Sequence, residues 1–298
     1  MTPAAALARP IRSMLFVPGN RASWIDKAAA AKADALVLDL EDSVPVAAKV
    51  EARVIVADAV ARHDPANGLL YVRTNPGTYM PDWDDVQAVV QPGLNGLFVA
   101  KVQGPEDVEV LARLVAEAEH RRGMAIGSIG FVVALETARA AELAFAIASH
   151  PRVQTLVSSA ARNADVARAL GFTWSAEGLE TLYFRSKTII ACRAAGKPFP
   201  IGGLWQDVHD LEGMRRFSAF NRQLGYTGEI VLHPSNVTVA NEAYSLSEQD
   251  RDYFAGMIAA FAEAEAQGKA AVIYRGEHVD IAHVETARET LRIHGGHA

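Results

Sequence analysis

Cysteine is almost absent from this sequence, which contains a single one, Cys192, in 298 residues. One thiol cannot form an intramolecular disulfide and cannot build a cysteine-rich zinc site. Because Cys192 lies in the apolar, helical-looking run 189–195, we expect it to be a small buried residue rather than a reactive thiol.

Long apolar runs, basic clusters and aromatic residues are also scarce. No stretch approaches about 18 apolar residues without a charge, so no transmembrane span is predicted. With 29 Lys and Arg against 35 Asp and Glu, the net charge is −6, and no basic face is offered to nucleic acid. An aromatic content of 7% favours helices packed on an aliphatic sheet over a β-sandwich. The N-terminus lacks a basic leader region, so we expect a cytoplasmic protein.

Short apolar runs alternate with amphipathic helical stretches along most of the chain. Runs such as ALVLDL and GLFVAKV are nearly continuous in hydrophobic residues, as expected for parallel strands covered on both faces. The predicted strands are 13–17, 35–40, 69–73, 96–102, 129–135, 154–158, 200–206 and 229–232. Strand–helix units repeated over about 245 residues favour an α/β fold, the (β/α)8 TIM barrel, over an open doubly wound sheet. No Gly-x-Gly-x-x-Gly fingerprint follows the first strand, which weakens a dinucleotide-binding alternative.

The chain is longer than such a barrel requires. We expect residues 1–245 to form a barrel catalytic domain and residues 246–298 to form a helical C-terminal extension. The extension exceeds what closes a barrel, so it is able to reach a neighbouring subunit.

Charged residues follow many of the predicted strands. Barrel active sites form at the carboxyl ends of the strands, so these residues are candidates for a site. They are Asp39, Glu41, Asp42, Arg73, Lys101, Glu136 and Asp165.

Two of these acids form a candidate metal site. Glu136 directly follows the apolar run FVVAL, and a carboxylate drawn inside needs a cation or a hydrogen-bond network. Asp165 lies just past the next strand, which neighbours the fifth around a barrel. Two such carboxylates, with water and substrate oxygens completing the shell, describe an ordinary Mg²⁺ site. The alternatives are that Glu136 and Asp165 form ion pairs, or that they hold other metal ligands in place without binding the metal themselves.

Arg73 ends the third predicted strand. Its planar guanidinium is able to clamp a carboxylate or stabilise an oxyanion. A structural pairing with Asp39, Glu41 or Asp42 from the preceding strand is the alternative, and one side chain can serve both purposes.

Four histidines lie near the C-terminus, at His278, His283, His294 and His297. Their spacing is not the His-x-x-x-His of a zinc-binding helix, so no zinc site is predicted from them.

A series of motifs resembles the citrate lyase beta-subunit family of the HpcH/HpaI aldolase superfamily, which includes malyl-CoA and citramalyl-CoA lyases. The series begins with RSMLFVPGNR (12–21), LDLEDSV (38–44) and KVEAR (49–53). It continues with VRTN (72–75), AKV (100–102), ALETA (134–138), DVARALG (165–171) and LHPSNV (232–237). The resemblance covers essentially the whole chain, and the ordered series is more specific than any single motif.

This resemblance implies a TIM barrel, a homotrimer or hexamer, a Mg²⁺ ion and a CoA-thioester substrate that yields a 2-oxo acid. Glu136 and Asp165 match the metal carboxylates, and Arg73 matches the active-site arginine. The tail segment GEHVDIAHVETA (276–287) resembles one that projects a catalytic Asp into the adjacent subunit, which places Asp280 in that role.

The remaining charged residues are assigned supporting or substrate-binding roles. Arg12 and Arg21, near the first strand, are candidates for binding the CoA phosphates or the substrate carboxylate. Asp39, Glu41, Asp42 and Lys101 are expected to support the site.

The sequence departs from the family pattern at three places. The loop before Asp165 reads SAARNAD where many relatives have a glycine and a second acid, so Arg162 adds positive charge there. Ala100 replaces a usual proline, and His278 replaces a usual methionine.

The first hypothesis is a Mg²⁺-dependent lyase that cleaves a 3-hydroxy-3-carboxyacyl-CoA to a 2-oxo acid and acetyl-CoA through a thioester enolate. Two alternatives remain open at this stage. One is a CoA-independent aldolase acting on a free 2-oxo-4-hydroxy acid, and the other is a non-catalytic accessory or binding subunit that keeps the barrel.

Overall fold

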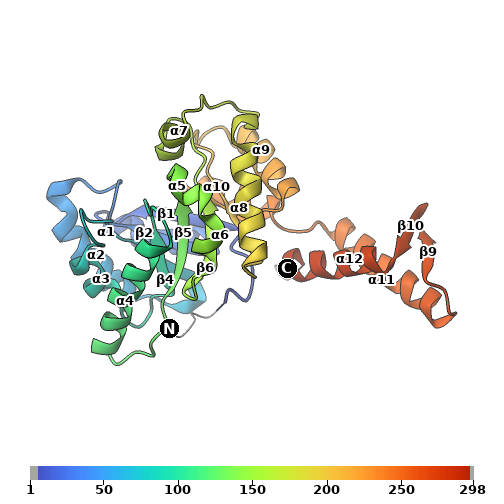
Figure 1. The fold of residues 1–298 in the computed structure, drawn as a ribbon, viewed down its shortest axis with the longest axis horizontal. Coiled ribbons are helices and arrows are strands. Elements are labelled where there is room, and N and C mark those ends of the chain that lie inside the picture. Colours follow the sequence, from blue (N-terminus) through green and yellow to red (C-terminus); the bar gives the residue numbers. More distant parts are fainter. Residues whose placement is uncertain (1–5, 296–298) are drawn as a thin grey trace. The chain divides into compact units, whose positions relative to one another are not determined.

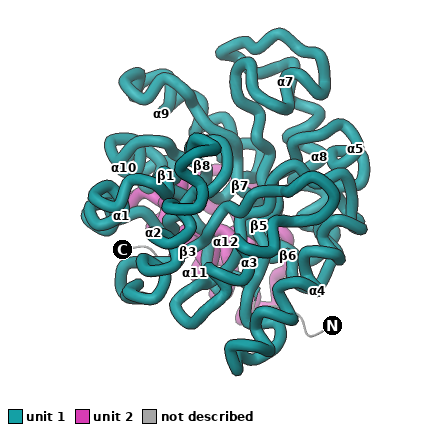
Figure 2. Tube along the Cα trace, turned by 90° about the vertical axis from the view of Figure 1, so that its left-hand side faces the viewer, with its two compact units in different colours: residues 1–243 teal, residues 244–298 magenta. Residues whose placement is uncertain are grey.

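The computed structural model describes residues 6–295. The chain forms two compact units, and the boundary between them along the sequence falls between Ala243 and Tyr244 (Figure 2). His297 lies outside the described residues. No helix in the described part of the chain is long and apolar enough to cross a membrane.

The first unit is a closed barrel of parallel strands in the order β1 to β8. Figure 1 shows helices such as α4 and α8 beside its strands. Its strands are β1 (Ser13–Pro18), β2 (Ala35–Asp39), β3 (Leu69–Arg73), β4 (Gly96–Val99), β5 (Gly130–Leu135), β6 (Val153–Ser158), β7 (Ile201–Gly202) and β8 (Gly228–Val231). Closure is completed by pairing of β1 with β8, where Met14 lies opposite Ile230. The predicted TIM barrel is confirmed.

Helices connect successive strands on the outside of this barrel. The α-helices of the unit are α1 (Ala22–Ala28), α2 (Lys49–Ala61), α3 (Trp83–Val89), α4 (Pro105–Arg121), α5 (Ala138–Glu142), α6 (Ala144–Ala148), α7 (Asp165–Leu170), α8 (Leu182–Ala194), α9 (Leu211–Leu224) and α10 (Pro234–Ala243). Short 3₁₀ turns are η1 (Ala29–Ala31), η2 (Val46–Ala48), η3 (Pro65–Asn67) and η4 (Leu179–Thr181). Helices α7 and α10 begin directly beyond the carboxyl-end loops of β6 and β8.

Alternation along the strands sorts their side chains between two apolar layers. Ala35 and Val37 belong to a cluster inside the barrel, whereas Leu36 and Leu38 pack with the helices outside. Since side chains alternate faces along a strand, Asp39 continues the inward row of β2. The same parity places Arg73 after Tyr71 on β3 and Glu136 two residues beyond Ala134 of β5, so the barrel's geometry gathers three charged groups at its mouth.

β7 is much shorter than the predicted strand 200–206. A Cβ at Gly203 would lie 2.5 Å from the Ser158 carbonyl oxygen at the end of β6, so only glycine permits this close backbone approach. The ladder ends at Gly202 rather than continuing to Gln206.

The second unit, residues 244–295 of the described chain, contains two helices and a β-hairpin. Helices α11 (Glu248–Ala266) and α12 (Ile281–His294) are joined through the antiparallel strands β9 (Ala271–Tyr274) and β10 (Glu277–Asp280). Arg275 and Gly276 both have positive φ, at 49° and 89°, as a two-residue type I′ turn requires. The helical extension is confirmed, and the hairpin within it is a feature that its helical periodicity did not predict.

Candidate active site

The carboxyl end of β2 holds a buried acid that organises its own loop. Asp39 is 1% exposed and accepts hydrogen bonds from the backbone N–H groups of Glu41 and Ser43 at 2.9 and 3.0 Å. Burial alone would raise the pKa of Asp39, but these bonds and the adjacent Arg73 hold it below its ordinary value. The carboxylate is therefore kept ionised in the protein interior.

Arg73 makes a two-pronged ion pair with that acid. Its Nε and Nη2 donate to Asp39 Oδ1 and Oδ2 at 2.6 and 2.7 Å, and its Nη1 lies 3.1 Å from Glu41 Oε2. The guanidinium also lies 5.2 Å from the centre of the Phe16 ring. Burial opposes its charge, yet the bonds to Asp39 raise the pKa of Arg73 above its usual range. The structural pairing of Arg73 with acids from the preceding strand is thus present, and it fixes the orientation of the guanidinium at the barrel mouth.

Lys101 follows β4 in a left-handed backbone conformation, with φ 58°. Its Nζ lies 2.5 Å from Glu41 Oε1 and 2.9 Å from Asp42 Oδ1, while its backbone N–H donates to Glu136 Oε2 at 3.1 Å. A non-glycine residue in this conformation is uncommon and marks a constrained position. The unusual backbone lets one residue contact the acidic loop after β2 and the acid after β5.

Glu136 is a buried carboxyl with few partners. It is 9% exposed, and its Oε2 accepts a hydrogen bond from the Lys101 backbone N–H at 3.1 Å. Burial raises the pKa of Glu136 to about 7, and the nearby Asp165 carboxylate adds to that rise while Arg73 opposes it. Glu136 and Asp165 are therefore close enough to repel one another.

These two carboxyls fit a divalent cation in charge and chemistry. A cation between them would relieve both the repulsion and the cost of burying Glu136. Asp165 begins α7, is about 29% exposed at its side chain and pairs with Arg168 one turn along. Among residues 6–295 no cluster of three or more metal-binding side chains occurs, so other ligands of such a cation would come from water, substrate or backbone oxygens.

Two hollows of small-molecule size adjoin this mouth. One, of about 260 Å³, is lined by β1 residues 15–18 and by Trp24, Lys27 and the segment 232–234 after β8. Arg21, the exposed residue just before α1, lies with its guanidinium 5.6 Å from the Trp24 ring. Arg21 is thus at the carboxyl end of the barrel, as expected.

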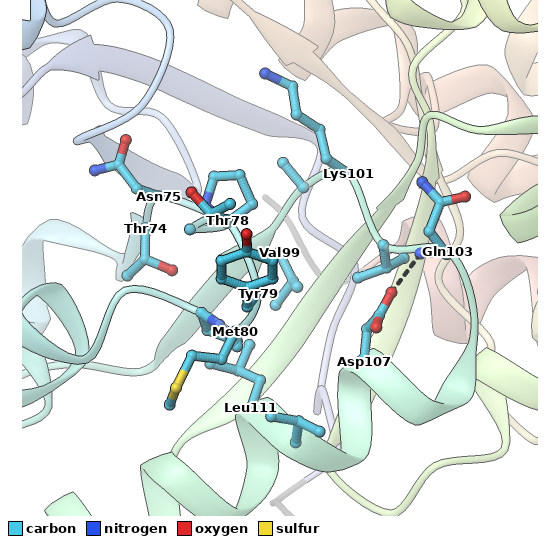
Figure 3. A pocket seen from close by; sticks show the side chains of 16 residues that line it. Thr74, Asn75, Thr78, Tyr79, Met80, Val99, Lys101, Gln103, Asp107 and Leu111 are labelled. Atoms are coloured by element: carbon cyan, nitrogen blue, oxygen red, sulfur yellow. Dashed lines mark hydrogen bonds between the residues drawn. The ribbon is translucent and has the colours of Figure 1, made fainter.

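The other hollow, of about 250 Å³, separates the loop after β3 from the end of β4 and the start of α4. Figure 3 shows Thr78, Tyr79 and Met80 on one side and Asp107 and Gln103 on the other, with the Lys101 side chain pointing away from Asp107. The Asp107 carboxylate accepts the Gln103 backbone N–H at 2.6 Å, which fixes the start of α4 beside it.

Arg12 does not belong to this site. It precedes β1, so it lies at the amino end of the barrel, opposite the mouth. There its Nε and Nη2 bind the two oxygens of Asp34, which precedes β2, each at 2.8 Å. The predicted substrate-binding role of Arg12 is corrected to a structural pairing between the starts of two strands.

A network behind the mouth was not predicted. Lys49 Nζ donates to the carbonyl oxygens of Leu40 and Glu41, each at 3.0 Å, and also contacts Asn75 Oδ1. The Asn75 amide then donates to Asp85 Oδ2 at 2.7 Å, and Arg53 binds the other oxygen at 2.8 Å. Lys49 and Arg53 are the two cations of the KVEAR motif, so the motif was the available signal. Their bonds hold the loops after β2 and β3 together.

Asp280 lies in the second unit, at the junction of β10 and α12. Its side chain caps α12 and contacts His283 Nδ1 at 2.6 Å, and this bond lowers the pKa of Asp280. Five of the predicted site residues come together in the first unit: Asp39, Arg73, Lys101, Glu136 and Asp165. Asp280 belongs to the second unit and is not brought into this group.

The barrel and its charged mouth define a TIM-barrel protein with a cluster of acidic and basic side chains at the carboxyl ends of its strands. Residues 12–234 match the family described as HpcH/HpaI aldolase/citrate lyase, and the chain belongs to that family. It is accordingly an enzyme of the lyase class. The non-catalytic accessory alternative is set aside on this basis.

Similar proteins cover nearly the whole chain. The L-malyl-CoA/beta-methylmalyl-CoA lyase of Cereibacter sphaeroides is 33% identical, with 96% of this chain and 95% of the relative covered. A (3S)-malyl-CoA thioesterase of the same organism is 29% identical, with 95% and 94% covered. The crystal structure of CitE from Mycobacterium tuberculosis with magnesium, acetoacetate and coenzyme A has a TM-score of 0.74 at 25% identity, covering 96% of this chain and 97% of that one.

Proposed function

We propose that the protein is a Mg²⁺-dependent carbon–carbon lyase acting on a 3-hydroxy-3-carboxyacyl-CoA such as malyl-CoA or citramalyl-CoA. The products are glyoxylate or pyruvate and acetyl-CoA. The observation that carries the proposal is the buried Glu136 carboxyl at the barrel mouth, close enough to Asp165 and to the fixed Arg73 for both charges to shift its pKa. The similarity to a malyl-CoA lyase supports the choice of thioester.

Glu136 and Asp165 are the residues that would hold Mg²⁺. Bound there, the ion would stabilise the substrate alkoxide and polarise the carbonyl that forms. The CitE structure that resembles this chain contains magnesium, which supports the assignment.

Arg73 stabilises negative charge at the mouth. The Asp39 carboxylate takes two of its nitrogens, so the guanidinium plane is set before substrate binds. When the carbon–carbon bond breaks, its electron pair passes to the thioester carbonyl as an enolate, and a preoriented cation lowers the free energy of that anion. Lys101 neutralises Glu41 and Asp42, so that the acidic loop does not repel the enolate.

The CoA moiety is assigned to the hollow beside β1. Trp24 and the apolar β1 residues offer contact surface, while Arg21 and Lys27 offer positive charge for phosphates. Asp280 from the tail of an adjacent subunit, in a homotrimer or hexamer, would take up the proton that the substrate hydroxyl releases and pass it to the enolate carbon. In the reverse direction its carboxylate would remove the α-proton of acetyl-CoA.

The test is release of a 2-oxo acid from malyl-CoA and citramalyl-CoA with saturating Mg²⁺, detected by lactate dehydrogenase or phenylhydrazone formation. The matched substrates are the free hydroxy acids without CoA, because a CoA-independent aldolase would cleave these instead. Absence of a 2-oxo acid from every thioester would refute the lyase assignment.

A second activity to test at the same site, beside cleavage, is hydrolysis of the thioester, favoured by the near full-length similarity to a malyl-CoA thioesterase. Hydrolysis yields free CoA thiol and malate, whereas cleavage yields glyoxylate and a CoA thioester. Parallel assays for free thiol and for glyoxylate from one malyl-CoA reaction separate the two.

A further inference from the structure

The Asp280 carboxylate is held asymmetrically. Its Oδ1 accepts the backbone N–H groups of Ala282 and His283 at 3.0 and 3.4 Å, and lies 2.6 Å from His283 Nδ1. Within residues 6–295 no group bonds to the other oxygen, Oδ2. One oxygen is thus anchored three times and the other is left for a ligand.

The short contact determines where the proton of His283 lies. An ionised carboxylate has no hydrogen to donate, so the 2.6 Å approach requires an N–H on Nδ1. The Asp280 backbone N–H also points to Nδ1, at 3.3 Å, but one nitrogen cannot accept there while donating to Oδ1. The shorter bond to the charged partner is the stronger of the two, and Nε2 is left facing away from the pair.

The scaffold under this pair is rigid. Val279 before Asp280 and Val284 after His283 are fully buried with Met257 and Phe261 of α11. Asp280 and His283 themselves are about half exposed, at 42% and 51% of their side chains. The polar pair therefore stands on a packed junction with its polar tips accessible, which suits a group that must reach a partner molecule.

We propose that His283 is a positioning residue for Asp280: its Nδ1–H pins Oδ1 so that Oδ2 is the oxygen presented to the substrate α-carbon. This rests on the proposed role of Asp280 as the acid and base of the lyase. The bond also lowers the pKa of Asp280, which keeps it ionised and ready to accept a proton.

Two substitutions at the same position separate positioning from helix capping. His283 occupies the third position of α12, where Gln and Glu are the usual capping-box residues. His283→Gln offers an amide oxygen as the cap acceptor for the Asp280 backbone N–H and an amide N–H as a donor to Oδ1. His283→Glu keeps the cap but replaces the donor with a repelling charge. Both variants should melt at similar temperatures, which a helix-capping role alone would also give.

Turnover is expected to differ between them. His283→Gln should stay within about 3-fold of the parent, whereas His283→Glu should lose about 100-fold in kcat with little change in KM, as for a misplaced acid–base group. Equal turnover of the two variants would overturn the positioning role. A change in KM alone, with kcat unaltered, would also overturn the positioning role.

A measurement that does not depend on catalysis tests the positioning role of His283 separately from the lyase assignment. Long-range ¹H–¹⁵N spectra of the intact protein with ¹⁵N-histidine, assigned by the loss of one signal in His283→Gln, should show His283 protonated at Nδ1. In Asp280→Asn the signal should shift toward the Nε2–H form. An Nε2–H tautomer in the parent would overturn the proposal whatever the activity. Full activity of Asp280→Asn would instead overturn the role of the tail in the proposed function, and the positioning role with it.

Discussion

Asp39 and Arg73, which end neighbouring strands, form a two-pronged ion pair with N···O distances of 2.6 and 2.7 Å. Register pairs these residues directly across β2 and β3, so the pair is a consequence of the barrel itself. Arg73→Lys removes the planar fork while keeping the charge. We expect kcat/KM to fall about 100-fold, the usual loss when one oriented donor to an oxyanion is removed.

A matched control for Arg73→Lys is Arg113→Lys on α4, whose guanidinium pairs with Glu109 at the surface. That change should leave kcat/KM unaltered. Steady-state kinetics with malyl-CoA measures both variants, and equal values for the two would show that the fork at position 73 is not used in the reaction.

Removal of either proposed metal carboxylate should weaken Mg²⁺ binding. Glu136→Gln and Asp165→Asn keep the size of each side chain but remove a charged ligand. We expect the dissociation constant to rise at least about 10-fold in each, measured by isothermal titration calorimetry. Glu109→Gln, at an exposed carboxylate of α4, is the control. Parent-like affinity in both test variants would place the ion elsewhere.

Two variants of Lys101 test the free-energy cost of its left-handed backbone conformation. Both Lys101→Ala and Lys101→Gly remove the ammonium from Glu41 and Asp42, but only glycine adopts φ 58° without strain. The glycine variant should therefore be more stable than the alanine variant by about 1 kcal/mol. Urea unfolding of the pair measures this difference, and a more stable alanine variant would contradict it.

The ion pair between Glu119 and Arg152 should make stability depend on pH in acid. Both residues are fully buried at the amino end of the barrel, with Arg152 Nη2 2.7 Å from Glu119 Oε2. The Glu119 carboxylate also accepts hydrogen bonds from the backbone N–H groups of Gly127 and Ile129. Burial opposes the charge, but the bonds from Arg152 lower the pKa of Glu119 below its ordinary 4.5.

The contribution of Glu119 is therefore complete above pH 4.5 and is lost as the pH falls through its lowered folded pKa. In Glu119→Gln this part of the acid dependence should be missing, and the free energy of unfolding at pH 7 should fall by about 3 kcal/mol because Arg152 stays buried without its anion. Denaturant titrations at pH 7 and pH 4 compare the two proteins. An unchanged pH dependence in the variant would assign the acid sensitivity to other carboxylates.

Cys192 should be unreactive in the folded enzyme. It is completely buried, and burial raises the pKa of its thiol to about 11. Reaction with a thiol reagent at pH 8 should therefore be slow and should follow global unfolding. Rapid labelling of the native protein would contradict this burial.

Sequence pattern located the strands because parallel barrel strands are buried on both faces and read as apolar runs. The third strand was predicted with the bounds 69–73 that the structure shows. Arg12 was misplaced because closeness to a strand in sequence does not tell which end of the barrel a residue occupies; it precedes β1 and so lies at the opposite end from Arg21. The β9–β10 hairpin was missed because its Arg275–Gly276 turn lacks the usual Asn or Asp signal.

The sequence by itself determined the barrel, the family motifs and the acids at the strand ends, since periodicity and motif order are local properties of the chain. Only the tertiary structure decided which partners those groups have. Arg73 meets Asp39 through strand register, and Lys101 contacts the loop after β2 and the acid after β5 through a left-handed backbone. Lys49, at the start of α2, links the loop after β2 to Asn75 after β3. These contacts join residues that are distant in sequence, and their geometry depends on barrel closure, which no local pattern encodes.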